Sequence, residues 1–426
     1  MKLSLENISK NLLFIGLLTL IYRSGSFSNS YPNPFELIFV VVCAVTIITA
    51  LKNKRIKEFF LSIPKNIRIA ACLLLGSVLL GWFVAVFVMN IPSPFNNVLE
   101  FGGFAIGLAL FLLIILFTRD DEVVAKKYFY ALLFPVVYIP FVFFPALAVR
   151  LHFAVEGSAF LGFTSNPNII SKILLIPLMF FITYAVFERK NTYVKIGYSI
   201  VATLLVSLVF WTGSRAALVS MVVGAMLIGV VFVRQYFRWQ NICLGFGLIV
   251  LIISSGYMLA PHHAKVGFVD RNLTASKITL AENTLLGKKK PLQVSVEEGG
   301  VAPVAIVPET RLRMWPVYLK LVVLHPLGFG PNTHMDVVYP NGEHKEIGPH
   351  NTYLEIWLWG GIVGLLSFLY ILFSAFKNLT TKLHTDGNPI TVALLATLFS
   401  LSIAILFNDS LQLFCFWAIL ALSSKR

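Results

Sequence analysis

The chain has 426 residues, of which 57% are hydrophobic, 14% are aromatic and only 13% are charged, and its formal net charge is +14. A soluble domain normally has about a quarter of its residues charged, so this composition excludes an ordinary soluble protein and indicates an integral membrane protein. The positive charge is weak evidence for nucleic-acid binding, because no basic cluster is interleaved with aromatic residues; it favours anionic membrane lipids instead.

Apolar windows of roughly 18 to 24 residues, the length that a bilayer core requires, recur along the chain. They lie near 11–22, 35–51, 67–91, 97–118, 128–149, 169–187, 193–211, 216–234, 241–260, 352–374, 388–407 and 410–422. The fold class predicted from them is an all-α polytopic membrane protein with about twelve transmembrane helices, the first and last of them short.

Lysine and arginine gather in alternate short loops, which the positive-inside rule places in the cytoplasm together with both termini. These basic loop residues are Lys52, Lys54, Arg55, Lys57, Lys65, Arg68, Arg119, Lys126, Lys127, Arg189, Lys190, Lys195, Arg234, Arg238, Lys377 and Lys382. The opposite short loops contain only Arg23, Arg150 and Arg215. The long segment 261–350 is therefore predicted to lie outside, which in a Gram-negative cell is the periplasm. No small-residue cleavage site precedes Arg23, so we expect the first helix to be retained.

Three parts are predicted to form one integrated unit: transmembrane helices 1–9 in 1–260, the large periplasmic, partly helical segment 261–350, and transmembrane helices 10–12 in 351–426. Within the periplasmic segment, 287–308 has the composition of a loop. The stretch 310–324 has apolar residues at three-to-four spacing, which predicts an amphipathic helix at the membrane surface. That helix should end at His325-Pro326, before a tight glycine-containing turn at 327–331.

Arg215, with Gly213 and Ser214, forms almost the whole connection between two apolar spans. A guanidinium so close to hydrocarbon costs on the order of a few kcal/mol unless it is paired or hydrated. One interpretation is an interfacial arginine that reaches toward water and pairs with Glu100 or Asp409. The other is an anion clamp, because a planar bidentate donor suits phosphate better than an ammonium does.

Arg311 and Arg313 open the amphipathic helix and are either solvated charges or further anion-binding groups. His350 lies just before the span that begins at Asn351, and Thr352 with Glu355 matches a capping box, which predicts a rigid turn. The histidine is either a hydrogen-bonded structural residue or a general base, for which an unperturbed pKa near 6.5 is well suited.

No metal site and no cofactor is predicted. His334, His344 and His350 are irregularly spaced and lack a pattern of carboxylate or cysteine partners, so a zinc site is disfavoured. The four cysteines fall inside apolar spans at unrelated spacings, which indicates neither disulfides nor a metal centre.

Taken in chain order, these motifs resemble the O-antigen ligase and polymerase family, roughly over residues 200 to 375, and the topology resembles that family over the whole chain. The motifs are Gly213-Ser214-Arg215, Arg311-x-x-x-Trp315, His325-Pro326-Leu327-Gly328-Phe329-Gly330, Pro349-His350-Asn351-Thr352-Tyr353-Leu354-Glu355 and Gly360-Gly361-Ile362-Val363-Gly364-Leu365.

The resemblance implies a metal-independent glycosyltransferase of the bacterial inner membrane whose donor is a glycan on undecaprenyl diphosphate. For a ligase, it implies a lipid A core acceptor at the periplasmic face. It makes Arg215 and Arg311 the diphosphate-binding residues and His350 the catalytic base, with Asn351 and Glu355 supporting the site. Because Arg313 departs from the residue type expected there, either that residue or Arg311 faces the donor.

Two alternatives remain open at this point. An O-antigen polymerase, which adds the growing glycan to another lipid-linked repeat unit, would share the donor and the catalytic groups. A transporter or flippase is the alternative from another class. It is disfavoured by the scarcity of mid-membrane acids, apart from Glu100 and Glu355 near outer helix ends, and by a long outer segment that transport does not require.

Overall fold

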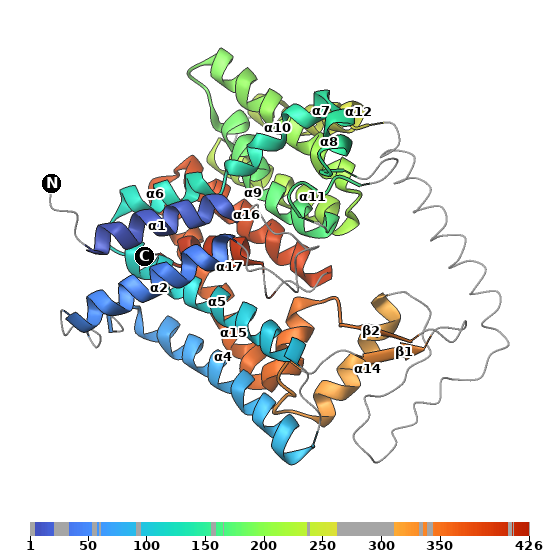
Figure 1. The fold of residues 1–426 in the computed structure, drawn as a ribbon. Helices are drawn as coiled ribbons and strands as arrows, with labels where there is room; N and C mark the ends of the chain where they lie inside the picture. The colour runs from blue at the N-terminus through green and yellow to red at the C-terminus, as the bar shows by residue number, and fades with distance from the viewer. Residues whose placement is uncertain are drawn as a thin grey trace.

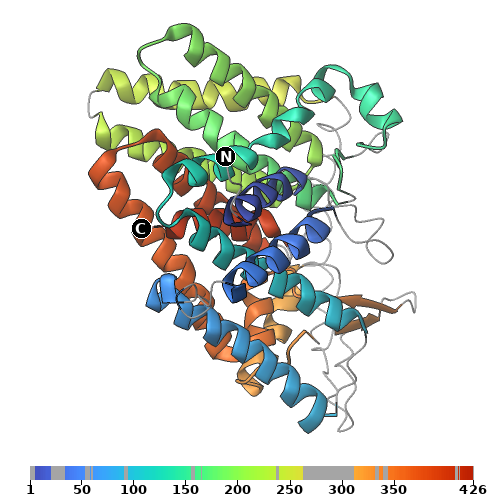
Figure 2. The same ribbon diagram turned by 60° about the vertical axis from the view of Figure 1, so that its left-hand side comes forward.

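The computed structural model describes residues 5–20, 34–52, 58, 61–90, 95–154, 159–164, 166–236, 239–261, 311–331, 335–338, 344–407, 411 and 413–425. Within these ranges, nine helical spans, one of them made of several short pieces, are long and apolar enough to cross a membrane, and three shorter apolar helices accompany them. Figures 1 and 2 show the long helices packed together, with one small hairpin beside them. The predicted all-α polytopic membrane fold is therefore confirmed.

The N-terminal helices pack around the C-terminal ones. Their bounds are α1 Leu5–Thr19, α2 Pro34–Lys52, α4 Lys65–Phe83 with a π-helical continuation η1 at Val84–Val88, and α5 Phe95–Thr118. Helix α4 packs along α15, α5 packs against α17, and α1 packs against α2. Helices α2, α4 with η1, and α5 match the predicted spans closely, because the hydrocarbon core sets their length. Helix α1 begins before the span predicted at 11–22 and ends at Thr19.

The span predicted at 128–149 is present, but it is broken into short pieces. These are α6 Glu122–Ala131, the 3-10 turn η2 Phe134–Tyr138, α7 Pro140–Phe143 and α8 Pro145–Arg150. Pro135, Pro140 and Pro145 recur at every fifth residue of this region. Each proline removes a backbone N–H and crowds the carbonyl four residues earlier, so a continuous helix cannot form.

A second group of helices follows, drawn green to yellow in Figure 1. It consists of α9 Pro167–Phe187, α10 Thr192–Thr212, α11 Arg215–Gln235 and α12 Trp239–Leu259. Helix α9 is buried along most of its length and packs against α10, α11 and α16. It therefore forms the centre of this group.

The C-terminal region contains the longest helix, α15, which runs for 35 residues from Thr352 to Asp386 and has a non-helical residue, Gly361, near its beginning. The helix continues well past the predicted end at 374, into a polar stretch. The remaining elements are α16 Pro389–Ala404, the 3-10 turn η4 Ile405–Phe407 and α17 Phe414–Ser424.

The part of the outer segment that the structure describes contains α14 at Arg311–Leu324, in agreement with the helix predicted at 310–324. An antiparallel hairpin of β1 Met335–Val338 and β2 His344–Ile347 follows it. This hairpin was not predicted, although Asn341-Gly342 is a common hairpin turn sequence. The loop predicted at 287–308 lies outside the described residues, as does Asp409.

Candidate active site

His350 lies between the hairpin and α15, and its backbone has a φ angle of 48°. This is the left-handed region, which costs a residue with a Cβ roughly 1–2 kcal/mol, although histidine adopts it more often than most residues do. The side chain is half-buried, and the preceding Gly348 and Pro349 are buried. Such a backbone conformation persists only where the surroundings fix it, and it is frequent at functional sites.

Asn351 fixes the turn from the helix side. Its Oδ1 accepts hydrogen bonds from the backbone N–H groups of Tyr353 (3.0 Å) and Leu354 (3.1 Å), so Asn351 is the N-cap of α15. The capping box predicted for Thr352 and Glu355 is therefore wrong by one residue. The reason is that asparagine is as good an N-cap as serine or threonine and comes first in the chain.

Trp315 fixes the turn from the other side. Its indole Nε1–H donates a hydrogen bond to the carbonyl of Pro349 at 3.1 Å, so α14 lies against the residue that precedes His350. Position 311, where α14 begins, is one helical turn before Trp315 on the same side of the helix, whereas position 313 lies nearly opposite. The side chains of Arg311 and Arg313 lie outside the described residues.

Arg215 is the first residue of α11 and is exposed. Gly213, with a φ angle of 66°, ends α10, and Ser214 takes the N-cap position of α11. The tight connection predicted between the two spans is therefore present.

The packing of α11 against α16 shows which end of the bundle Arg215 occupies. Gly224 of α11 is in contact with Ser400 of α16, and the Cβ position of Gly387, just before α16, is 3.4 Å from Nε2 of Gln235 at the end of α11. The two helices are therefore antiparallel, and Gln235 and Gly387 share one end of the bundle. Arg215 lies at the other end, where α16 passes into η4.

The His350 turn is at this same end. The ring of Phe407, the last residue of η4, lies 6.4 Å from the ring of Trp315, which is hydrogen-bonded to Pro349. Three predicted site positions from separate parts of the chain, Arg215, the beginning of α14 and His350, are thus located at one end of the bundle.

A turn that follows α14 also docks into α15, and we call residues 326–330 and 358–362 together the glycine cradle. Gly361 has φ 61° and ψ −163°, so α15 is interrupted there and its carbonyls at 358 and 359 are open to other donors. The hydrogen bonds across the cradle are Phe329 N to Leu358 O (2.6 Å), Gly330 N to Trp359 O (2.9 Å) and Ile362 N to Pro326 O (3.1 Å). Together with the Trp315 bond, they hold α14 to α15 at two separate points.

His325 and Glu355 each lie shortly before one of the two segments of the cradle. The ring of His325, directly after α14, packs against Phe329 at 4.4 Å, and burial lowers the pKa of this imidazole below its usual value. Glu355 is half-buried in the first turn of α15, where the positive end of the helix dipole favours a carboxylate. The role of Glu355 stays a prediction.

Sequence reasoning missed two residues that organise this end of the molecule. Trp315 belongs to the predicted amphipathic helix and to one of the motifs, and nothing in its spacing indicates a hydrogen bond to a residue 34 positions later. Gly361 was recognised in a motif, but not as a break in α15. The pair Gly360-Gly361 inside a long apolar run could have indicated that break, because glycine lowers helix stability.

These features define a multi-pass membrane protein with a candidate site at one end of its helical bundle. Residues 200–369 match the family model described as O-Antigen ligase. The matched region is less than half of the chain, runs from α10 into α15, and includes Arg215, both arginines at the start of α14, and His350. The predicted resemblance to the O-antigen ligase and polymerase family is confirmed over this region, and it supports function of that type. The chain matches no curated protein.

Proposed function

We propose that the protein is an O-antigen ligase, which transfers a glycan from undecaprenyl diphosphate to a hydroxyl of the lipid A core at the periplasmic face of the inner membrane. The observation that carries the proposal is the His350 turn. An imidazole with a left-handed backbone is held between the Asn351 cap and the Trp315 hydrogen bond, at the end of the bundle where α11 and α14 begin. The family match over 200–369 supports a function of the O-antigen ligase or polymerase type.

In this reaction the acceptor hydroxyl attacks the sugar carbon C1, and the bond from C1 to the diphosphate oxygen breaks. His350 takes the proton of the attacking hydroxyl, and undecaprenyl diphosphate leaves with the bonding electron pair. A single direct attack inverts the anomeric centre, and no covalent intermediate with the enzyme forms. A base positioned in this way contributes about a hundredfold to ten-thousandfold in rate.

The arginines would stabilise the charge that builds on the departing diphosphate, which is usually the larger contribution. Arg215 is suited to this role because it is exposed and lies at the beginning of α11. Of the two arginines in α14, position 311 is the better candidate, since it shares the side of the helix that carries Trp315 toward Pro349. Guanidinium groups bind phosphate oxygens in bidentate fashion.

The test uses purified protein in lipid vesicles with an undecaprenyl diphosphate-linked glycan as donor and lipid A core as acceptor. We expect glycan transfer, and a rate lowered about a hundredfold to ten-thousandfold in His350→Ala. His350→Asn is the matched variant, because asparagine also tolerates a left-handed backbone but cannot act as the base. A His350→Asn variant as active as the wild type would refute the catalytic role.

The same assay separates the alternatives. Growth of the glycan on the donor lipid without transfer to lipid A core would identify a polymerase. Movement of unchanged substrate across the vesicle membrane would identify a transporter. Arg311→Gln should raise the KM for the donor more than Arg313→Gln does. The opposite order would assign donor binding to Arg313.

A further inference from the structure

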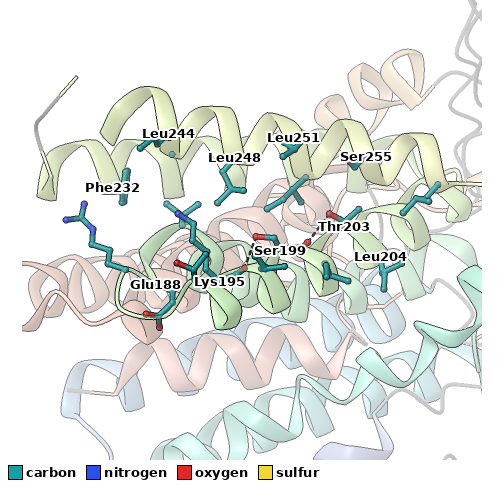
Figure 3. Close-up of a pocket in the computed structure, with 18 of the residues that line it drawn as sticks. Glu188, Lys195, Ser199, Thr203, Leu204, Phe232, Leu244, Leu248, Leu251 and Ser255 are labelled. Carbon is teal, nitrogen blue, oxygen red and sulfur yellow. Dashed lines mark hydrogen bonds between the residues drawn. The ribbon is translucent and has the colours of Figure 1, made fainter. Parts of the chain in front are cut away.

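A cavity of about 910 Å³ lies between α10 and α12, and the proposed reaction does not use it. Figure 3 shows Lys195, Ser199 and Thr203 of α10 facing a row of leucines on α12, with Phe232 of α11 at one end. We call this cavity the α10–α12 groove.

Two hydroxyl groups on the α10 wall, those of Ser199 and Thr203, are already satisfied within their own helix. Ser199 donates its hydroxyl hydrogen to the carbonyl of Lys195, and Thr203 donates to the carbonyl of Ser199, both at 2.9 Å. Because these donors have partners, an alkyl chain beside them leaves no buried donor unpaired. Leu244, Leu248 and other apolar residues of α12 form the opposite wall, so the groove is suited to hydrocarbon.

The groove is longer than the hydrocarbon part of one bilayer leaflet. Its lining on α12 extends from Leu244 to Leu259, a rise of roughly 22 Å along the helix. One leaflet contributes about half of a hydrocarbon core of about 30 Å. A single acyl chain that enters at one end would therefore reach the middle of the membrane.

The mouth of the groove is positively charged. Arg189 and Lys195 both line it, and Lys190 is adjacent in the chain. The guanidinium of Arg189 lies 3.5 Å from the ring centroid of Tyr236, a cation–π contact that holds it at the mouth. Its N–H groups at the edge of the guanidinium plane can still donate to a phosphate.

One carboxylate opposes this charge. Glu188 also lines the mouth, and its side chain accepts hydrogen bonds from the backbone N–H groups of Lys190 (2.8 Å) and Asn191 (3.1 Å), which lower the pKa of Glu188. It is therefore charged at neutral pH and turned toward its own loop. Arg189, Lys190 and Lys195 outnumber it, so the mouth favours an anion.

We propose that the α10–α12 groove binds one phospholipid with an anionic headgroup, its phosphate beside Arg189 and Lys195 and one acyl chain between the two helices. The positive-inside rule assigns this loop to the cytoplasmic leaflet. The lipid would thus be distinct from the glycan donor proposed at the opposite end of the bundle, and the proposal does not depend on the reaction.

The first experiment measures headgroup selectivity. The purified full-length chain is equilibrated in mixed micelles with phosphatidylglycerol and phosphatidylcholine, and the retained lipids are counted by native mass spectrometry. Each basic residue near a lipid headgroup contributes about 1 kcal/mol, which is about fivefold in affinity. We expect the wild type to prefer phosphatidylglycerol and the Arg189→Gln/Lys195→Gln variant to lose roughly twenty-five-fold of that preference. Arg234→Gln/Lys377→Gln, which removes two exposed cations outside the groove lining, should keep it.

The second experiment tests the acyl-chain site. Leu251→Trp fills the groove, whereas Val250→Trp makes the same change at a neighbouring position outside the lining; the two side chains are 61% and 60% exposed. We expect Leu251→Trp to lower lipid retention about tenfold and Val250→Trp to leave it unchanged. Equal retention in both variants would overturn the proposal.

Two other outcomes would also overturn it. If millimolar inorganic phosphate displaced the lipid completely, the groove mouth would be a simple anion site. If the wild type formed dimers that Leu251→Trp dissociated without a change in bound lipid, the occupant would be a second copy of the chain.

Discussion

The glycine cradle and the α10–α12 groove have opposite kinds of packing. In the cradle, backbone groups of two segments are hydrogen-bonded to one another, and the glycines leave room for no added side chain. In the groove, side chains of two packed helices line a large open volume. Proton transfer requires positions fixed to a fraction of an ångström, whereas a flexible lipid chain requires only an apolar wall and charge at the mouth. The difference implies that substitutions in the cradle should lower the free energy of unfolding strongly, whereas substitutions in the groove should lower it little.

Gly361→Ala should have the largest effect on stability. An added Cβ would overlap the carbonyl oxygen of Pro326, and the φ angle of 61° is unfavourable for alanine. We expect a loss of about 3 kcal/mol or more in the free energy of unfolding. Thermal unfolding of the purified protein in detergent measures it.

Gly76→Ala in α4 is the matched control. A Cβ at Gly76 meets nothing within 4 Å among the residues that the structure describes, and alanine is a better helix former. The midpoint temperature of thermal unfolding of this variant should equal that of the wild type or be slightly higher. Equal midpoints for the two variants would contradict the rigid character assigned to the cradle.

The sequence was sufficient to predict the helices because a bilayer requires long apolar runs, which remain visible without a structure. It was also sufficient for the beginning and end of α14, since apolar periodicity stops at His325-Pro326. The broken helix at 128–149 could have been predicted from its three regularly spaced prolines. The cradle could not, because docking of Pro326 on Ile362 depends on how two distant segments pack, and local patterns do not determine that.

The candidate site likewise has some features that the sequence predicts and others that depend on tertiary contacts. His350 and Arg215 are at helix beginnings that the ends of apolar runs indicate. The left-handed backbone of His350 and its link to α14 through Trp315 arise from tertiary contacts, so the sequence alone predicted a rigid turn but assigned its cap to the wrong residue.

Trp315→Phe should lower the stability less than Gly361→Ala does, and it should also lower activity. Phenylalanine keeps most of the ring packing but removes the hydrogen bond to Pro349, which contributes about 1 kcal/mol. If His350 acts as proposed, a looser turn should lower kcat about fivefold to tenfold, with little change in KM for the donor. Steady-state kinetics of glycan transfer would measure both constants.

Trp357→Phe is the control for this variant. The Nε1 atom of Trp357 is buried and has no hydrogen-bond partner within the described ranges of the chain, so its loss should not slow transfer. If the two variants slowed transfer equally, the hydrogen bond from Trp315 would not be what positions the turn.

The smallest effect should come from substitution of His325, which links α14 to the cradle, and it should appear in the pH dependence of folding stability. Burial against Phe329 lowers its pKa in the folded state, so the unfolded chain binds the proton more tightly. Folding stability should therefore be unaffected above about pH 6.5, the usual pKa of histidine, and should fall as the pH drops below that value. His325→Gln removes this contribution while the other histidines remain. The decrease in the midpoint of unfolding between pH 8 and pH 5.5 should thus be smaller in the variant than in the wild type. An equal decrease in both proteins would mean that His325 is as well solvated in the folded chain as in the unfolded one.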